Sequence, residues 1–184
     1  MKPAKTERSP TNGPPATPRK AASRDAASDY HAKTTHEADR LSRLAKKAGR
    51  PVPLGDASSG VMLAVEPPVG PRLLDALTRS LESVGLSQAY VTWTDTGHLL
   101  EEILALEPDA LVAVGPVAAQ KLDALDYPLV RNLFSEAREG EWFSWTIGTA
   151  GLRLPPLAPA LEDEAAKRRF WRAFLSLKRL TRTS

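Results

Sequence analysis

The sequence predicts an α/β fold: a three-layer α/β/α sandwich built on a mostly parallel, four-stranded sheet and preceded by a disordered N-terminal tail. Short apolar runs alternate with longer amphipathic segments through the middle of the chain, which is typical of β-α-β units. The run from Ala110 to Val114 has no polar residue, as expected of a strand that helices cover on both faces. Pro108 ends the helix before this strand, and Gly115 with Pro116 begins the helix after it, so the links are short.

Composition divides the chain into three parts. Residues 1–33 are rich in Pro, Ala, Ser, Thr and basic side chains and have almost no large apolar residue. Such a segment cannot bury enough apolar surface to offset the entropy of ordering, so we expect a disordered basic tail. Residues 34–60 are expected to form a short helix and a linker, and residues 61–184 a single α/β domain. Because this domain contains every predicted strand, we expect it to fold without residues 1–50.

The short helix before the domain has end signals and a narrow apolar stripe. Thr34 and Glu37 form a capping-box pattern, and Gly49 marks the C-terminal end. This helix would lie loosely on the domain, dock into the groove of a partner protein, or bind nucleic acid or a membrane. We expect the docking role, because so short a helix is marginal alone in water and gains most from a partner's groove. The expected partner-binding residues are Leu41, Leu44, Arg40 and Lys47.

The elements of the domain follow from apolar spacing and from turn residues. Strands are expected at 61–65, 89–93, 110–114 and 142–147, and the last of these is expected to pair with residues 150–154. Helices are expected at 71–84, 97–106, 116–125 and 162–180. This alternation predicts right-handed crossovers and helices on both faces of the sheet.

Charge and composition exclude several classes of function. Residues 61–164 carry 6 basic and 16 acidic side chains, whereas residues 165–184 carry 7 basic side chains and no acidic one. An acidic body argues against a broad nucleic-acid-binding face across the sheet. The absence of cysteine excludes disulfides, thiol catalysis and iron–sulfur clusters, and we expect no cofactor or metal. No apolar run has the length of a membrane span or the form of a signal peptide, so we expect a cytoplasmic protein.

Four motifs, in order, resemble the uracil-DNA glycosylase superfamily. The first is the loop Val65-Glu66-Pro67-Pro68-Val69-Gly70, and the second is the strand end Thr92-Trp93. The third is the unit from Glu107 to Gln120, and the fourth is the loop 154–161 with the stretch Lys167-Arg-Arg-Phe-Trp171 that follows it. Together they span about two-thirds of the chain. The resemblance implies a glycosylase-like α/β fold for residues 61–180.

The sequence lacks two of the family's three functional side chains. The family positions water from the first loop, reads uracil with an Asn and stabilises the leaving base with a His. Glu66 remains in the first loop, but Trp93 stands where the Asn would be, and Leu154 or Pro155 where the His would be. We therefore expect no enzyme activity, with Glu66 as the only catalytic candidate. The alternative is a divergent uracil-DNA glycosylase-like enzyme or a DNA-base-binding protein.

A non-catalytic family with this fold supplies the preferred interpretation. The chain is similar to the psi-subunit family of the bacterial DNA polymerase III clamp loader in its first strand and helix and in the helix that contains Trp171. The stretch Ser144-Trp-Thr-Ile-Gly148 and the turn 159–161 add to this likeness. The resemblance implies a protein-interaction subunit in DNA replication or repair. Its implied partners are the clamp-loader and chi subunits.

The remaining charged residues have structural explanations as well as functional ones. Glu101 and Glu102, like residues 162–164, are expected to be solvated or to lie favourably at helix N-termini. Asp95 and His98 are better explained as a helix cap and an exposed helix residue than as an acid–base pair. The basic C-terminal helix forms either a solvated face or a nucleic-acid contact. Its candidate contacts are Lys167, Arg168, Arg169, Arg172, Lys178 and Arg179.

Overall fold

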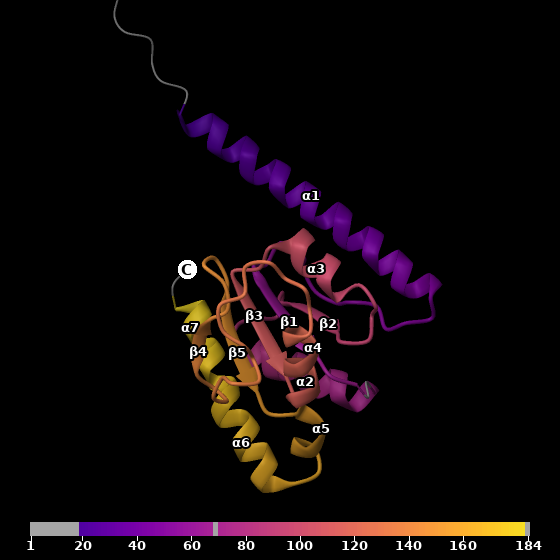
Figure 1. The fold of residues 1–184 in the computed structure, drawn as a ribbon, viewed down its shortest axis with the longest axis vertical. Helices are drawn as coiled ribbons and strands as arrows, with labels where there is room; N and C mark the ends of the chain where they lie inside the picture. The colour runs from indigo at the N-terminus through magenta and orange to yellow at the C-terminus, as the bar shows by residue number, and fades with distance from the viewer. Residues whose placement is uncertain (1–18, 68–69, 183–184) are drawn as a thin grey trace, which may run out of the picture.

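One mixed sheet of five strands forms the centre of the protein (Figure 1). The computed structural model describes residues 19–67 and 70–182. The strands are β1 (Val61–Val65), β2 (Tyr90–Trp93), β3 (Ala110–Val114), β4 (Trp142–Ser144) and β5 (Ala150–Leu154). They lie in the order β2-β1-β3-β5-β4, and only β4 runs antiparallel to its neighbour. The mostly parallel α/β sheet is therefore confirmed.

The prediction of four strands was wrong by one. Residues 142–147 do not form one continuous strand, because the chain turns back after Ser144, where the Trp145 N–H donates a hydrogen bond of 3.1 Å to the Thr149 main-chain oxygen. The central position beside β3 belongs to β5, in register from Ala110 opposite Ala150 to Val114 opposite Leu154. The short β4 lies at the edge of the sheet as the antiparallel partner of β5.

The helices alternate with the strands and then close the C-terminal end. They are α1 (Arg19–Lys47), α2 (Pro71–Ser83), α3 (Leu99–Leu106), α4 (Pro116–Asp123), α5 (Leu157–Ala160), α6 (Glu164–Phe174) and α7 (Lys178–Thr181). A 3-10 turn at Leu175–Leu177 joins α6 to α7, so the predicted C-terminal helix is present in two pieces. Asp163 caps α6 by accepting a hydrogen bond of 2.6 Å from the Ala166 N–H.

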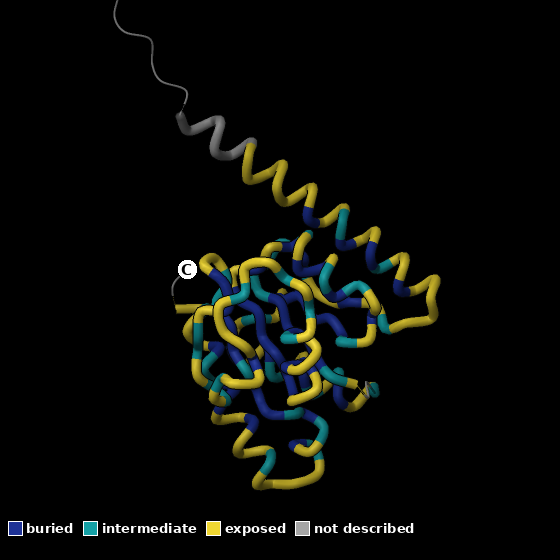
Figure 2. The backbone as a smooth tube through the Cα atoms, in the orientation of Figure 1, coloured by how far each residue is buried: buried dark blue, intermediate teal, exposed yellow. Residues whose placement is uncertain are grey.

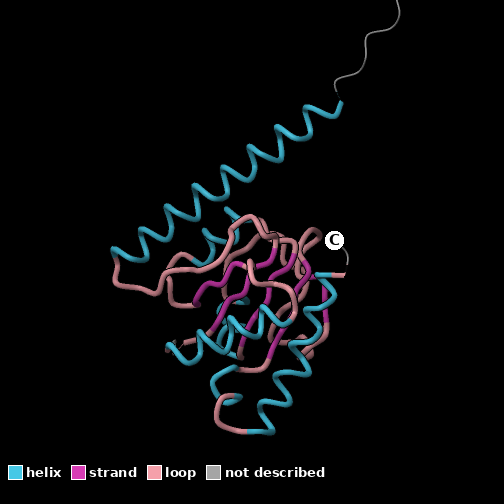
Figure 3. Tube along the Cα trace, turned by 180° about the vertical axis from the view of Figure 1, so that it is seen from behind, coloured by secondary structure: helices cyan, strands magenta, loops and turns pink. Residues whose placement is uncertain are grey.

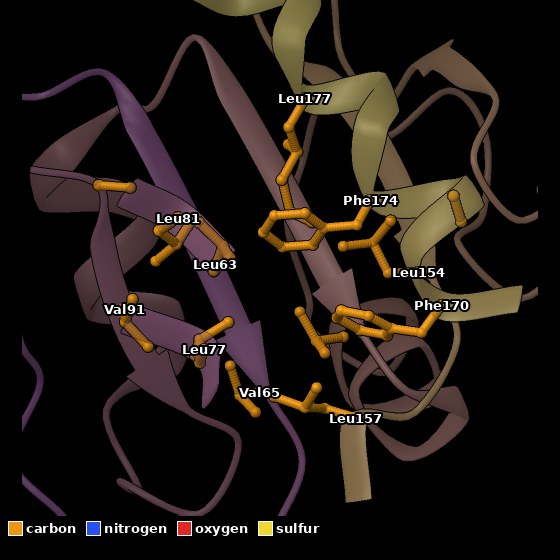
Figure 4. Close-up of a cluster of buried hydrophobic side chains, with 14 of the residues drawn as sticks. Leu63, Val65, Leu77, Leu81, Val91, Leu154, Leu157, Phe170, Phe174 and Leu177 are labelled. Carbon is orange, nitrogen blue, oxygen red and sulfur yellow. The ribbon is translucent and has the colours of Figure 1, made fainter. Parts of the chain in front are cut away.

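Helices cover both faces of the sheet, which confirms the three layers. On one face, Leu63 and Val65 of β1 pack with side chains of α2, α5 and α6 (Figure 4). On the other face, Met62 and Ala64 pack with side chains of α1, α3 and α4. The alternation of successive β1 residues between the two clusters follows from the period of two in a strand. Figure 3 shows the helical layers from behind.

The N-terminal helix differs most from the prediction. α1 begins at Arg19 rather than at residue 34, so residues 19–33 of the predicted tail are helical, while residues 1–18 lie outside the described residues. The reason is local composition, because this segment consists largely of Ala, Arg, Lys and other residues that a helix tolerates. Residues 26–33 are exposed and extend beyond the domain (Figure 2).

The second half of α1 belongs to the folded core. Thr34, Ala38, Leu41 and Ala45 are all buried, and their spacing places them on one side of the helix, which contacts α3. The Tyr30 hydroxyl donates a hydrogen bond of 2.9 Å to the main-chain oxygen at the end of α3. The domain boundary predicted at residue 61 therefore divides a packed unit.

The segment between α1 and β1 also joins the sheet. Leu54 forms an antiparallel bridge with Val91 through two main-chain hydrogen bonds of 2.8 Å. This bridge covers part of the free edge of β2, where unpaired main-chain groups would otherwise face water. In the part of the chain that the structure describes, no helix has the length and apolar character needed to cross a membrane.

Candidate functional site at the carboxyl ends of the strands

The parallel strands bring their carboxyl ends to one edge of the sheet. Val65 ends β1 opposite Trp93 of β2 and Val114 of β3, and Val114 in turn lies opposite Leu154 of β5. In open α/β sheets, ligands bind at this edge, at the point where successive crossovers go to opposite faces. Here that point lies between β1 and β3, because α2, which follows β1, packs on one face and α4, which follows β3, packs on the other.

Glu66 occupies this position, but its carboxylate is already bound within the protein. Its Oε2 accepts a hydrogen bond of 2.7 Å from the Val117 N–H in the first turn of α4. Gly115, the N-cap residue of α4, has no side chain that could accept a hydrogen bond from the first turn of the helix. The N-terminus of a helix attracts anions, and Glu66 provides one from the end of the neighbouring strand β1. Glu66 is therefore a helix-capping residue in this structure.

Gly115 makes the close approach of Glu66 possible. Its φ of 98° lies in the region that favours glycine, and a Cβ there would come within 2.0 Å of the Glu66 carboxyl carbon. A larger residue would strain the main chain and displace the carboxylate. The Glu66–Gly115 contact thus fixes the end of β1 against the start of α4.

Buried apolar side chains also lie at this edge. Trp93 is 2% exposed, and its Nε1–H donates a hydrogen bond of 3.2 Å to the Val52 main-chain oxygen. Leu154 is fully buried and Pro155 is buried beside it. Figure 4 shows Val65 and Leu157 side by side at the end of β1, and Leu154 near Phe170 and Phe174. The positions that would hold the uracil-reading Asn and the leaving-group His are thus parts of the core.

A carboxylate that the sequence analysis placed in solvent is buried. Glu102 of α3 is fully buried, whereas Glu101 is exposed, so the prediction of a solvated pair was wrong for Glu102. Helical spacing explains this, because position 102 lies on the same side of α3 as the buried residues Leu99, Ile103 and Leu106. That spacing was visible in the sequence, but the two adjacent carboxylates suggested a polar face.

Glu102 lies in a small buried polar cluster with Tyr90, Thr92 and Thr96. Burial raises the pKa of Glu102 to about 7, and the neighbouring Thr92 and Thr96 hydroxyls oppose part of this change. Neither carboxylate oxygen has a hydrogen-bond partner of good geometry among the described residues. Burial also raises the pKa of Tyr90, as does the nearby Glu102 carboxylate. The cluster has no exposed member, so it does not present a reactive group to a substrate.

The other proposed acid–base groups do not form a pair. Asp95 is exposed, and the His98 Nδ1 lies 3.9 Å from the Glu101 carboxylate rather than facing Asp95. His98 itself, not Asp95, occupies the N-cap position of α3. In the described ranges 19–67 and 70–182, no three His, Asp or Glu side chains gather as metal ligands.

The structure separates the predicted partner-binding residues of α1. Leu41 is 1% exposed and packs into the domain, so it is not free to enter a partner's groove. Leu44 is 38% exposed, and Arg40 forms an ion pair of 2.8 Å with Glu37. Lys47 is exposed at the end of the helix. The remaining three residues lie on the outer side of α1.

The residues predicted to contact nucleic acid also lie in different surroundings. Arg169 is held by Glu139 through two hydrogen bonds of 2.7 Å, which join α6 to the loop before β4. Lys167 and Arg168 both lie near the Glu164 carboxylate, at 3.9 and 3.5 Å. Arg172, Lys178 and Arg179 are exposed farther along the C-terminal helices. These side chains do not form one uniform basic face.

The chain was compared with protein-family models and with curated proteins, and neither comparison found a match. The interpretation of the site therefore depends on the residues and on their geometry.

Proposed function

We propose that this chain is a non-catalytic protein-interaction subunit that works in DNA replication or repair. One observation carries the non-catalytic part of the proposal. The edge of the sheet where α/β proteins bind their ligands is filled by Trp93, Leu154 and the capped carboxylate of Glu66. A base-excising enzyme needs an open pocket there to receive a flipped nucleotide.

The link to DNA replication comes from the sequence resemblance to the psi-subunit family. Under this proposal the partners are the clamp-loader and chi subunits, and any contact with DNA is weak or indirect. The exposed outer side of α1, with Leu44, Arg40 and Lys47, supplies one surface for a partner. Leu41 is not part of that surface, because its side chain stabilises the domain itself.

Affinity capture from the native host tests this proposal. The full chain, tagged at its C-terminus, should capture clamp-loader subunits, and a variant with Leu44→Asp and Lys47→Glu should capture them less well. Arg138→Glu is the matched control, because Arg138 is an exposed residue that pairs only with the nearby Glu141. Capture of no replication or repair protein by the full chain would contradict the proposal.

A further inference from the structure

An apolar hollow lies between α2, α5 and α6, at the end of the domain opposite α1 (Figure 1). Its volume is about 440 Å³, which is within the range of pockets that hold ligands or partner side chains. Its apolar lining includes Ala76 of α2, Leu157 of α5, and Leu161 directly after α5. Phe170 and Trp171 of α6 complete it. Leu157 also lies beside Val65 at the end of β1, so the hollow adjoins the edge of the sheet, but Glu66 is not among its lining residues.

Trp171 gives the hollow a rigid, exposed aromatic wall. The side chain is 40% exposed, although Phe170 and Phe174 beside it are buried. Its ring stacks on the Phe174 ring with centroids 5.7 Å apart and an angle of 13° between the planes. A ring that is already ordered loses little further entropy when it contacts a partner. Exposed Trp residues of this kind are common among the residues that dominate binding energy.

Basic side chains dominate the rim. The charged residues that line the hollow are Glu164, Lys167 and Arg168, so two cations share one carboxylate. All three side chains are more than 60% exposed, and ion pairs of that kind contribute little to stability. Either cation would therefore replace its ion pair with Glu164 by one with a partner's carboxylate at little loss of free energy.

We infer that this hollow binds an acidic amphipathic segment of a partner protein, with an aromatic or aliphatic side chain of that segment inserted beside Trp171. The inference rests on the proposed interaction role of the chain. The apolar lining fits the inserted side chain, and Lys167 and Arg168 fit flanking Asp or Glu residues. An amphipathic helix places such anchors on one side and its charges on the other.

A nucleic-acid strand fits this hollow less well. Binding to single strands uses a series of cations that follows the phosphates, with aromatic rings exposed for stacking. Here only two cations line the hollow, both beside a carboxylate, and Ala76, Leu157 and Leu161 form the rest of the lining. The lining thus favours a protein segment.

A panel of defined peptides tests the inference with the purified full chain. Each peptide has about 14 residues, with Phe, Leu, Ile or Trp at the i, i+3, i+4 and i+7 positions. One half of the panel has Asp and Glu at the other positions, and the matched half has Lys. Fluorescence polarisation of labelled peptides measures the affinity. Acidic members should bind, their affinity should fall with added salt, and the Lys members should not bind.

Substitutions locate the binding. Trp171→Ala should weaken it roughly tenfold. Ala76→Gln, which fills the hollow from α2 and leaves the stack with Phe174 intact, should have a comparable effect. Arg168→Glu should weaken binding about fivefold. Arg138→Glu, an equivalent charge reversal on an exposed Arg outside the hollow, should change it less than about twofold.

Three results would overturn the inference. The first is that no acidic member binds, and the second is that the Lys members bind equally well. The third is that Ala76→Gln binds like the unmodified chain. Binding of an oligodeoxythymidine probe that depends on Trp171, with no binding of acidic peptides, would make the hollow a nucleic-acid site instead. Because pure protein and defined peptides are used, the outcome is separate from the capture of clamp-loader subunits.

Discussion

Two glutamates show how the position of a residue in the fold decides its role. Glu66 lies at the edge of the sheet where a catalytic group would be useful, yet it caps α4. Glu102 has the perturbed pKa typical of catalytic carboxylates, yet it is enclosed between α3 and the sheet. The Glu66 carboxylate is committed to a hydrogen bond within the protein, and the Glu102 carboxylate is enclosed away from solvent.

Glu102 should make the stability of the protein depend on pH. Folding raises the pKa of Glu102 from 4.5 to about 7. Between pH 4.5 and pH 7, therefore, the carboxyl is protonated in the native state and ionised in the unfolded state. Stability contributed by this group is complete below pH 4.5 and is lost as pH rises to about 7. At pH 8, Glu102→Gln should therefore raise the free energy of unfolding by about 3 kcal/mol.

Urea denaturation at pH 4.5 and pH 8 measures this effect. The gain from Glu102→Gln should nearly vanish at the lower pH, because the native carboxyl is then protonated. Glu101→Gln is the control, since Glu101 is exposed and should show no such dependence. A gain of equal size at both pH values would mean that packing, rather than the charge, is responsible.

Removal of the Glu66 carboxylate should affect stability. Glu66→Ala leaves the Val117 N–H without its partner and should lower the free energy of unfolding by about 1 kcal/mol. Thermal or urea denaturation checks this value. Glu141→Ala, on an exposed loop residue, should be nearly neutral. An unchanged stability in Glu66→Ala would show that the carboxylate does not cap α4 in solution.

At the scale of elements, the strands and helices in the middle of the chain could be predicted from the sequence. The start of α1 and the extent of β4 could not. The strand Ala110–Val114 has the predicted bounds, because an apolar run between Pro108 and Gly115 leaves little freedom. The start of α1 was missed because residues 19–33 have no apolar periodicity, and only their helix propensity indicates a helix. The edge strand β4 was overestimated because Trp145 and Ile147 continue the apolar pattern beyond the turn.

The candidate site was predicted in part. The resemblance placed Trp93, and Leu154 or Pro155, where the glycosylase family has polar residues, and it left open whether these side chains are buried. Their burial depends on α2, α5 and the segment near Val52, which are distant in sequence. The capping of α4 by Glu66 depends in the same way on the pairing of β1 with β3.

The packing of α1 gives a prediction at this scale. Leu41→Ala should lower the free energy of unfolding by about 3 kcal/mol, because it leaves a cavity between α1 and the domain. Leu44→Ala removes the same atoms from a side chain that is 38% exposed and should cost less than about 1 kcal/mol. Equal effects in urea denaturation would mean that α1 does not pack onto the domain in solution.

The same packing reverses the expectation that the domain folds without residues 1–50. Deletion of this segment removes Leu41 and Ala45 and exposes the apolar side of α3. We now expect the truncated chain to be strongly destabilised or unfolded, as judged by circular dichroism during heating. A truncated chain that melts at the temperature of the full chain would restore the boundary at residue 61.

At the scale of the whole molecule, the fold has the layout of an open α/β sheet, and the buried Trp93 and Leu154 end two of its strands at the carboxyl edge. Leu44 on α1 and Trp171 on α6 are among its exposed large apolar side chains, as are Leu129, Ile147 and Val117, the last beside Glu66. The helices α1 and α6 are at opposite ends of the domain (Figure 1).

The closed edge of the sheet is the central claim, and a base-excision assay tests it most directly. The purified full chain should release no uracil from single-stranded or double-stranded DNA, because Trp93 and Leu154 occupy the space that a flipped base requires. An active uracil-DNA glycosylase on the same substrates serves as the positive control. Release of uracil by the chain, abolished by Glu66→Gln, would contradict the claim and would establish Glu66 as a catalytic residue.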